Sequence, residues 1–535
     1  MKKQSDFEER VEAFRPAQEL SAELGPQGGQ TSPQKRKILP FVIGGGVLAV
    51  AILLAVFLVP KLFASPKSQV WKAFAKLGAE WEFPVAEEIG WESLMTAVSS
   101  KQSMELELYL DELPASTSPD EAVLLKNMGV RLAANSDQDE KQMDAELMFR
   151  MGGSDLFSFQ FYGDEDLLSL AIPELFNGAL GIGTGNLREQ VENSPLFDQM
   201  NLSESELAEL DFSLNPWEWM GKEGNEELTE RLMESLRQLE EAIRVEKKDQ
   251  TKKISIGGEK QECQGYVMVI PKEDVLAFLE EYMAVYQDAL KQQMELFGTM
   301  NTVSMYGENP WEEMEGDFED LLDEIDKIME DEWDVEVYLT KSGDLAQILV
   351  KDLSDWVKED IEEIQFELTF SGEERPSDEI YLSMMDSYED GIFAEKTTDR
   401  SKTETITRWS IGEESNGKKN DALSIENRYN SDSQEFSYRM NLEEEEIELF
   451  VEGSLGEVEK GKSVVFEIDA LGLQTDGERM AFAGSLTYGE LEESIEKPSD
   501  IRMVMEMDEE EFEELGTEFL QGIQNLQNAL MQILY

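Results

Sequence analysis

The sequence lacks histidine entirely and contains one cysteine in 535 residues. Without histidine there can be no Ser-His-Asp or Cys-His nucleophile pair, no histidine proton shuttle and no histidine-ligated metal. A lone cysteine, Cys263, excludes intrachain disulfides, cysteine-based zinc sites and iron–sulfur clusters. We therefore expect a protein that is not an enzyme and has no cofactor, and we assign no catalytic, cofactor-binding or metal-ligating residue.

Basic residues are also scarce. The 46 lysines and arginines stand against 116 acidic residues, which gives a formal net charge of −70 and a pI near 4.1. Such a surface repels phosphate backbones, so we exclude nucleic acid as a partner and retain cations, basic proteins and neutral ligands. Hydrophobic residues at 41% and aromatic residues at 9% still suffice for a large core, which argues against a wholly disordered chain.

One long uncharged hydrophobic run stands out against this charged background. Residues 38–60 are long enough to cross a hydrocarbon core of about 30 Å as a helix. Lys35, Arg36 and Lys37 directly precede the run, and cations at this position favour a cytoplasmic N-terminus. The sequence therefore predicts a single-pass protein of the cell membrane whose C-terminal part is extracytoplasmic.

The run predicts an anchor that is not cleaved. A signal peptidase needs small residues at its cleavage site, whereas Leu62 and Phe63 stand two positions before Ala64 and Ser65. Inside the run, Gly45 and Ala49 have the spacing that seats a second membrane helix, although glycine is also common in single spans.

Composition and periodicity divide the chain into five regions. They are a flexible cytoplasmic tail (1–37), the transmembrane helix (38–60), juxtamembrane helices (61–100), a β-meander with inserted helices (101–352) and an antiparallel sheet with a C-terminal helix (353–535).

The fold class that this order predicts is α+β. Apolar residues alternate with polar ones in many short runs after residue 101, as in Met104, Leu106 and Leu108, which is typical of strands with one wet face. Helical periodicity marks 66–79, 85–99, 225–244, 271–297, 311–333 and 508–534. We expect a transmembrane helix followed by a large curved antiparallel sheet, half-barrel-like and in one lobe or two, packed on amphipathic helices. The helices 271–297 and 508–534 are expected to close its apolar face.

This order of elements resembles the half-barrel of exported lipoprotein carriers of the LolA and LppX groups. In several stretches of its sequence the chain is more similar to uncharacterised single-pass exported proteins of clostridia-type Gram-positive bacteria. The stretches that carry this second resemblance are YGDEDLLSLAIPELF, LREQVENSPLF, CQGYVMVIPKEDVLAFLEEY and DVEVYLTKSGDLAQILV. The resemblance implies a location at the cell surface and supplies no site residues.

Two short patterns imitate known binding loops. Gly456, Gly461, Lys462 and Ser463 match the spacing of a phosphate-binding loop, but alternating residues follow where that loop needs a helix, so we predict a hairpin turn.

The second pattern is Asn135, Asp137, Asp139 and Glu146, which match a calcium-binding loop in spacing. Glu140 occupies the position where that loop needs glycine, and strand-like residues flank it. We predict a solvated hairpin tip.

The remaining notable side chains have structural interpretations that compete with functional ones. Cys263 shares a strand face with small and apolar residues, which predicts a buried, inert thiol. Three tryptophans near the membrane indicate either an interfacial belt or ordinary packing: Trp71, Trp81 and Trp91. Methionines in predicted strands indicate core filling or a lipophilic cavity: Met104, Met143, Met268, Met440, Met480 and Met505.

These observations favour a membrane-anchored extracytoplasmic scaffold that acts in cell-envelope binding or assembly, with an envelope protein as partner. Two alternatives stay open: a carrier or sensor of a lipophilic ligand in a half-barrel cavity, and a carboxylate-based cell-envelope hydrolase. The carrier predicts a sizeable apolar cavity, the scaffold an exposed apolar or acidic patch, and the hydrolase a cleft in which acids converge.

Overall fold

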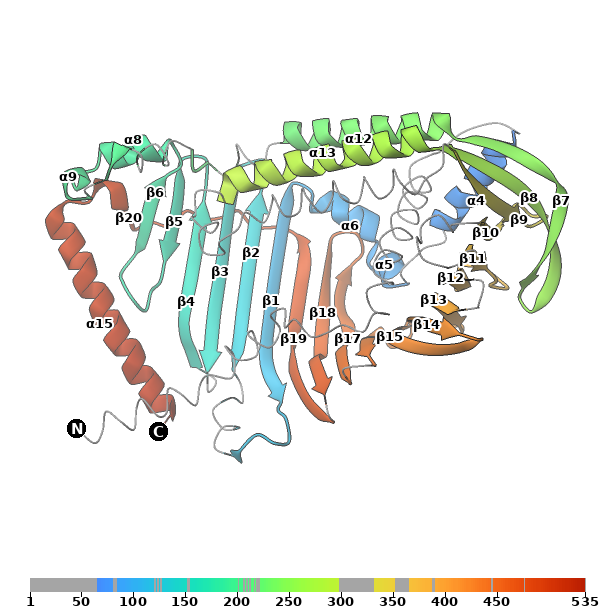
Figure 1. Ribbon diagram of the computed structural model, residues 1–535. Helices are drawn as coiled ribbons and strands as arrows, with labels where there is room; N and C mark the ends of the chain where they lie inside the picture. The colour runs from blue at the N-terminus through green and yellow to red at the C-terminus, as the bar shows by residue number, and fades with distance from the viewer. Residues whose placement is uncertain are drawn as a thin grey trace, which may run out of the picture. The chain divides into compact units, whose positions relative to one another are not determined.

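The computed structural model describes residues 65–534 with internal gaps. The longer gaps are 80–83, 218–221, 298–331, 352–364 and 387–389, and the others are one or two residues long. All described residues belong to one compact unit, Val59–Tyr535. The fold is α+β and is dominated by one large, mostly antiparallel open sheet (Figure 1).

Within the described residues, twenty strands make up this sheet. The first six are β1 (Lys101–Glu112), β2 (Gly129–Asp137), β3 (Gln142–Met151), β4 (Ser154–Gly163), β5 (Leu167–Ala171) and β6 (Ala179–Gly183). The next seven are β7 (Arg244–Ile256), β8 (Glu259–Pro271), β9 (Glu332–Leu339), β10 (Leu345–Val350), β11 (Gln365–Phe370), β12 (Glu379–Met385) and β13 (Asp390–Arg400). The last seven are β14 (Glu404–Ser415), β15 (Lys418–Asn430), β16 (Glu435–Leu442), β17 (Ile447–Glu459), β18 (Ser463–Thr475), β19 (Glu478–Glu490) and β20 (Ile501–Met503).

The strands form two meanders that meet in the middle of the sheet. Strands β1 to β6 pair in sequence order, and so do β7 to β19. The meanders join where β1 pairs antiparallel with β19, while β20 adds parallel to β6. The first and last parts of the described chain are therefore neighbours in one sheet.

Helices cover parts of this sheet. Their bounds are α4 (Pro66–Ala79), α5 (Pro84–Ile89), α6 (Trp91–Ala97), α8 (Leu187–Glu192), α9 (Phe197–Met200), α12 (Lys222–Ala242), α13 (Lys272–Phe297) and α15 (Glu509–Leu534). Helix α4 packs against β7, β9 and β10, and α6 packs against β19. Helices α12 and α13 lie side by side, and Arg231 joins them through Glu281 and Asp288 (Figure 1).

Periodicity predicts most of these elements well. Helices α4, α12 and α13 are confirmed to within a turn, as are most strands from β7 onwards. The predicted helix 85–99 is instead two helices, because Gly90 between α5 and α6 has a φ of +67°, a left-handed conformation that interrupts an α-helix.

Two other predictions, one strand and one helix, differ from the structure or lie partly outside the described residues. The strand predicted at 501–507 ends at Met503 and continues as a 3₁₀ turn, and it pairs parallel where we expected an antiparallel sheet. Of the helix predicted at 311–333, the last two residues begin β9, and the rest lies outside the described residues. Strands β2, β5, β6 and β13 were missed.

The prediction that α13 and α15 together close the apolar face of the sheet is wrong for α15. Helix α15 lies at the end of the sheet formed by β4 to β6 and β20 (Figure 1), where Gly522 packs against Leu175 and Glu518 accepts a hydrogen bond from Arg502. Phe512 and Phe519 of α15 are 51% and 41% exposed, although the periodicity placed both inward. Helix α13 packs against α12 and β8, and its side chains Val275 and Phe278 are buried.

Within the described ranges, no helix is both long and apolar enough to cross a bilayer. The predicted tail 1–37 and transmembrane helix 38–60, with Gly45 and Ala49, lie outside the described residues and stay predictions.

Candidate functional site

The sheet has one continuous apolar face. Residues directly opposite each other on neighbouring antiparallel strands point to the same side, so one row can be followed from strand to strand. The row runs through Phe159 (β4), Leu147 (β3), Leu132 (β2), Leu106 (β1), Leu486 (β19), Phe466 (β18) and Leu455 (β17). We call the side of the sheet that carries this row the apolar face.

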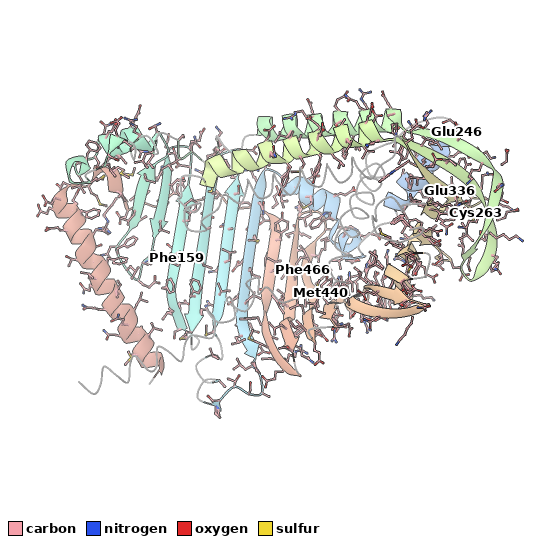
Figure 2. The ribbon with its side chains drawn as sticks, in the orientation of Figure 1. Phe159, Glu246, Cys263, Glu336, Met440 and Phe466 are labelled. Carbon is pink, nitrogen blue, oxygen red and sulfur yellow. The ribbon has the colours of Figure 1, made fainter. Side chains whose placement is uncertain are left out.

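Aromatic rings and methionines add to this face. Phe149 and Phe157 stack with ring centroids 4.9 Å apart, and Phe159 meets Phe157 edge-on at 5.2 Å. Figure 2 marks Phe159, Phe466 and Met440, which come from three strands of this face. Together these contacts form a wide apolar surface instead of an isolated patch.

Helices bury this face unevenly. Leu455 and Val464 are 5% and 0% exposed, because Ile89 of α5 and Leu94 of α6 pack onto them. All six residues of β10 are also buried near α4. By contrast, every residue of β3 is only half-buried, and so are the row members in β1, β2 and β4. The apolar face is therefore closed under α4 to α6 and half-open over β1 to β4.

We call the opposite side of the sheet the polar face. It is stabilised by arginines that each contact two carboxylates. Arg131 of β2 donates from Nε to Glu105 at 2.7 Å and from Nη1 to Glu146 at 3.3 Å. Arg408, Arg439 and Arg479 each bridge two carboxylates in the same way. A cation between two carboxylates offsets their mutual repulsion, so few basic residues stabilise a very acidic sheet surface.

The described residues line two clefts on the polar face. One of about 660 Å³ lies between β2 to β5 and the segment 496–500, and we call it the strap cleft. The other, of about 610 Å³, lies over β13 to β17 and combines acids with Arg408, Lys419 and Arg439. Both are partly open and mix polar with apolar lining, so neither is the enclosed apolar cavity that a lipophilic carrier needs.

The phosphate-loop pattern lies in a β-hairpin, as predicted. Gly456 belongs to β17, and Ser463 starts β18 where a phosphate loop needs a helix. Gly461 has a φ of +81° and donates its N–H to the carbonyl of Ile89 at 2.8 Å. The hairpin tip thus docks onto the junction of α5 and α6.

The calcium-loop pattern also lies in a predicted hairpin, between β2 and β3. Asp137 accepts hydrogen bonds from the backbone N–H groups of Asp139 and Glu140, and from Lys101 at 2.7 Å. Burial raises the pKa of Asp137, but these donors outweigh it, and its pKa is below the ordinary value. Glu146 lies further along β3, on the polar face beside Arg131. Asp137 therefore caps the turn, and Glu146 does not join it.

Cys263 is fully buried, as predicted, and burial raises the pKa of its thiol. It packs with Ile254, Ala346 and Tyr338 in a small core between β7 to β10. Next to this core, Glu336 accepts hydrogen bonds from Tyr338 at 2.5 Å, from Lys248 at 2.7 Å and from Lys351 at 3.0 Å (Figure 2). Sequence reasoning missed this cluster, because its members lie in three separate stretches of the chain.

The tryptophans and methionines divide between the two interpretations. Trp71 is buried, Trp91 is 48% exposed, and Trp81 lies outside the described residues. Met268 fills the core at 2% exposure, whereas Met505 lies in a 3₁₀ turn and not in a strand. Half-buried methionines on the apolar face are Met104, Met143, Met440 and Met480.

Comparison with known proteins adds little. No protein-family model matches the chain, and no curated protein is similar to it. Among solved structures, a match is a double mutant of the vaccine antigen transferrin binding protein B from Haemophilus parasuis Hp5, with 7% identity over 74% of this chain and 76% of that chain. Its TM-score is 0.10, at which the similarity supports no conclusion about fold or function.

Proposed function

We propose that the chain is a non-catalytic, membrane-anchored extracytoplasmic protein that binds an envelope protein through its apolar face. The observation that carries the proposal is the half-open state of this face over β1 to β4. Proteins rarely leave a large contiguous apolar surface open unless it contacts a partner. The proposed location at the cell membrane rests on the predicted anchor at 38–60 and on the resemblance to exported single-pass proteins. We further propose that the open sheet curves into a half-barrel.

The shape of the face favours a protein partner over a lipid. A small lipophilic ligand is held in a pocket that buries most of its surface, whereas both clefts described above lie on the polar face. A broad row of leucine and phenylalanine side chains suits a partner helix or strand, which buries such a surface over its length.

A hydrolase is supported less well. Glycoside hydrolysis needs one protonated carboxyl as its general acid. In the strap cleft, Asp144 accepts a hydrogen bond from Asn135 at 2.8 Å, and Glu146 accepts one from Gln160 at 3.0 Å. Each carboxyl thus lies beside an amide donor, and neither contact singles out one of them as a proton donor.

Site-specific photo-crosslinking in intact producing cells tests the proposal. A photoreactive residue at Leu486 lies on the apolar face, and the matched control at Thr487 lies on the polar face of the same strand. We expect one discrete protein adduct from position 486 and none from position 487. Adducts to lipid alone would favour the carrier, and equal adducts from both positions would contradict a docking role for the apolar face.

The location has a separate test. Protease added to intact cells should remove most of the chain and leave a short N-terminal fragment protected by the membrane. Protection of the C-terminal part would refute the orientation.

A further inference from the structure

Two segments of this acidic chain carry a net positive charge. Helix α4 and residues 244–260, which form most of the β7–β8 hairpin, together contain nine basic and three acidic residues, whereas the whole chain contains 46 and 116. They also pack together, because α4 contacts β7 and the Tyr266 hydroxyl donates to Gln69 of α4 at 2.6 Å. Two stretches that are far apart in the sequence therefore form one positive region.

The lysines of the hairpin divide between its two sides. Lys247 of β7 lies directly opposite Tyr266 of β8, and Lys253 lies opposite Glu262. Paired residues share a face of the sheet, and alternate residues of one strand share it too. These two lysines and Lys260 therefore project to the side of Tyr266, where α4 lies. We call this side of the hairpin, together with α4, the basic surface.

Four lysines of the basic surface are free to bind a partner. They are exposed and make no hydrogen bond or ion pair with any described residue: Lys72, Lys247, Lys253 and Lys260. The other two have partners, since Lys67 donates to a main-chain carbonyl and Lys76 pairs with Asp344. On the other side of the hairpin, Lys248 pairs with Glu336 at 2.7 Å. A partner can therefore bind the four exposed lysines without breaking an existing ion pair.

The chemistry of the basic surface favours a wide anionic partner. Neither of the two clefts described above is lined by one of the four exposed lysines. A lysine ammonium is a hydrated point charge and lacks the planar fork with which arginine binds one carboxylate or phosphate. Lysines spread over a hairpin and a helix thus suit an anionic surface better than a single small anion.

The predicted anchor indicates which anionic surface lies nearby. The anchor ends at residue 60, and α4 begins at Pro66. The five residues between them span at most about 18 Å. With that anchor in the bilayer, α4 starts close to the lipid headgroups, whereas the acidic remainder of the chain is repelled by headgroups that are anionic.

We propose that the basic surface lies on anionic lipid headgroups of the membrane that holds the chain. This proposal rests on the anchor of the proposed function. Ammonium groups of the four exposed lysines donate hydrogen bonds to headgroup phosphates, and each adds to the electrostatic attraction. The contact determines which side of the extracytoplasmic part faces the membrane, because the acidic remainder is repelled.

Protection of a strand edge is the competing explanation for these lysines. Within the described residues β7 pairs with β8 alone, at one end of the sheet (Figure 1), and charged side chains keep such an edge from pairing with another chain. Charge of either sign gives this protection, whereas attraction to anionic lipid needs positive charge. Replacement of lysine by glutamate therefore separates the two roles.

Fluorescence quenching in vesicles tests the proposal. The full chain, carrying Ser255→Cys with a fluorophore, is reconstituted through its anchor into equal parts of phosphatidylglycerol and phosphatidylcholine, with a nitroxide-headgroup lipid as the quencher. Ser255 is exposed on the basic surface, opposite Lys260, while the native Cys263 is 0% exposed and stays unlabelled. The matched label position is Ser154→Cys, exposed in β4 towards the other end of the sheet (Figure 1).

We expect at least threefold stronger quenching at position 255 than at position 154. The difference should disappear in 0.5 M NaCl and in pure phosphatidylcholine. It should also disappear in the triple variant Lys247→Glu, Lys253→Glu, Lys260→Glu. It should persist in a control that reverses three exposed lysines elsewhere: Lys402→Glu, Lys418→Glu and Lys460→Glu. The salt and lipid comparisons decide the matter if either triple variant fails to fold.

The possible failures can be told apart. Equal quenching at the two positions, in vesicles with which the chain floats, would overturn the proposal and leave the anchor standing. A chain that does not float with the vesicles would refute the anchor and this proposal together. A photoreactive residue at position 255 in producing cells should give lipid adducts, and a discrete protein adduct there would overturn the proposal in favour of an acidic protein partner.

Discussion

Leu106 of β1 lies directly opposite Leu486 of β19. This pair belongs to the seam, the β1–β19 pairing that joins the meander β1 to β6 to the meander β7 to β19. Two residues further along β1, Leu108 faces Gly484, where the two backbones approach closely. The integrity of the whole sheet therefore depends on residues that are among the most distant in the sequence.

Because the backbones of β1 and β19 approach closely at Gly484, we expect a single added methyl group there to destabilise the sheet. In Gly484→Ala the new Cβ would collide with the carbonyl oxygen of Glu107, which forces β1 away from β19. We expect a loss of about 1–3 kcal/mol in the free energy of unfolding, measured by urea unfolding followed by circular dichroism. Ser485→Ala, at the next position of β19, is the control and should change the midpoint little. Equal midpoints for the two variants would show that the seam tolerates a wider spacing.

The uneven cover of the apolar face predicts unequal costs for the same truncation. Leu455 lies beneath α5 and α6 and is 5% exposed, whereas Leu132 is half-buried. Leu455→Ala should cost about 2–4 kcal/mol, and Leu132→Ala less than half of that, because less apolar surface is withdrawn from water. Urea unfolding measures both. A cost at Leu132 as large as that at Leu455 would mean that the face is covered in the folded protein.

The lowered pKa of Glu336 predicts that the folded protein loses stability in acid. Burial raises the pKa of Glu336, but the donors Lys248, Tyr338 and Lys351 outweigh burial and lower its pKa to about 2. Since this pKa lies below the ordinary value of 4.5, the stabilisation is complete above pH 4.5 and is lost as the pH falls towards 2. It amounts to about 3 kcal/mol.

Glu336→Gln tests this. The variant should be less stable than the wild type at pH 7, and the difference should vanish near pH 2, as measured by urea unfolding across that range. Glu457→Gln, at an exposed position of β17, is the control. A constant difference between the Glu336 variant and the wild type at all pH values would contradict the expectation.

The arginines that each contact two carboxylates should contribute to the free energy of unfolding, and salt should reduce this contribution. Arg131→Gln leaves Glu105 and Glu146 without their common cation and should cost about 1 kcal/mol at low ionic strength, and less in 0.5 M NaCl because salt screens the repulsion. Lys402→Gln removes the same charge from an exposed lysine and should have little effect at either salt concentration. A cost at Arg131 that salt does not reduce would indicate lost packing instead of lost charge.

The periodicity of the sequence predicts the elements far better than their arrangement. Alternation such as that of Met104, Leu106 and Leu108 identifies strands because it reflects burial of one face, which is a local property. It fails in β13, where polar residues such as Lys396 and Thr398 occupy the apolar side, and in the short strands β5 and β6.

Long-range features left no local signal. The periodicity of α15 correctly gives its apolar stripe but not the partner that the stripe contacts, and Phe512 and Phe519 consequently turned out exposed. The lining of the strap cleft unites residues of β2 to β5 with the segment 496–500, which the pairing of β1 with β19 brings together. The only hint in the sequence was the excess of acids, and that excess marks no particular position.

The seam also bears on the order in which the chain can fold. Strand β1 is made early in synthesis, but its partner β19 emerges only after the entire second meander. Until then one edge of β1 has unpaired backbone groups, and such an edge can pair with another chain. Contacts between residues so distant in sequence also slow folding. We therefore expect completion of this sheet to be a late event, and the interval before it to be when the chain is most open to aggregation or to the action of a chaperone.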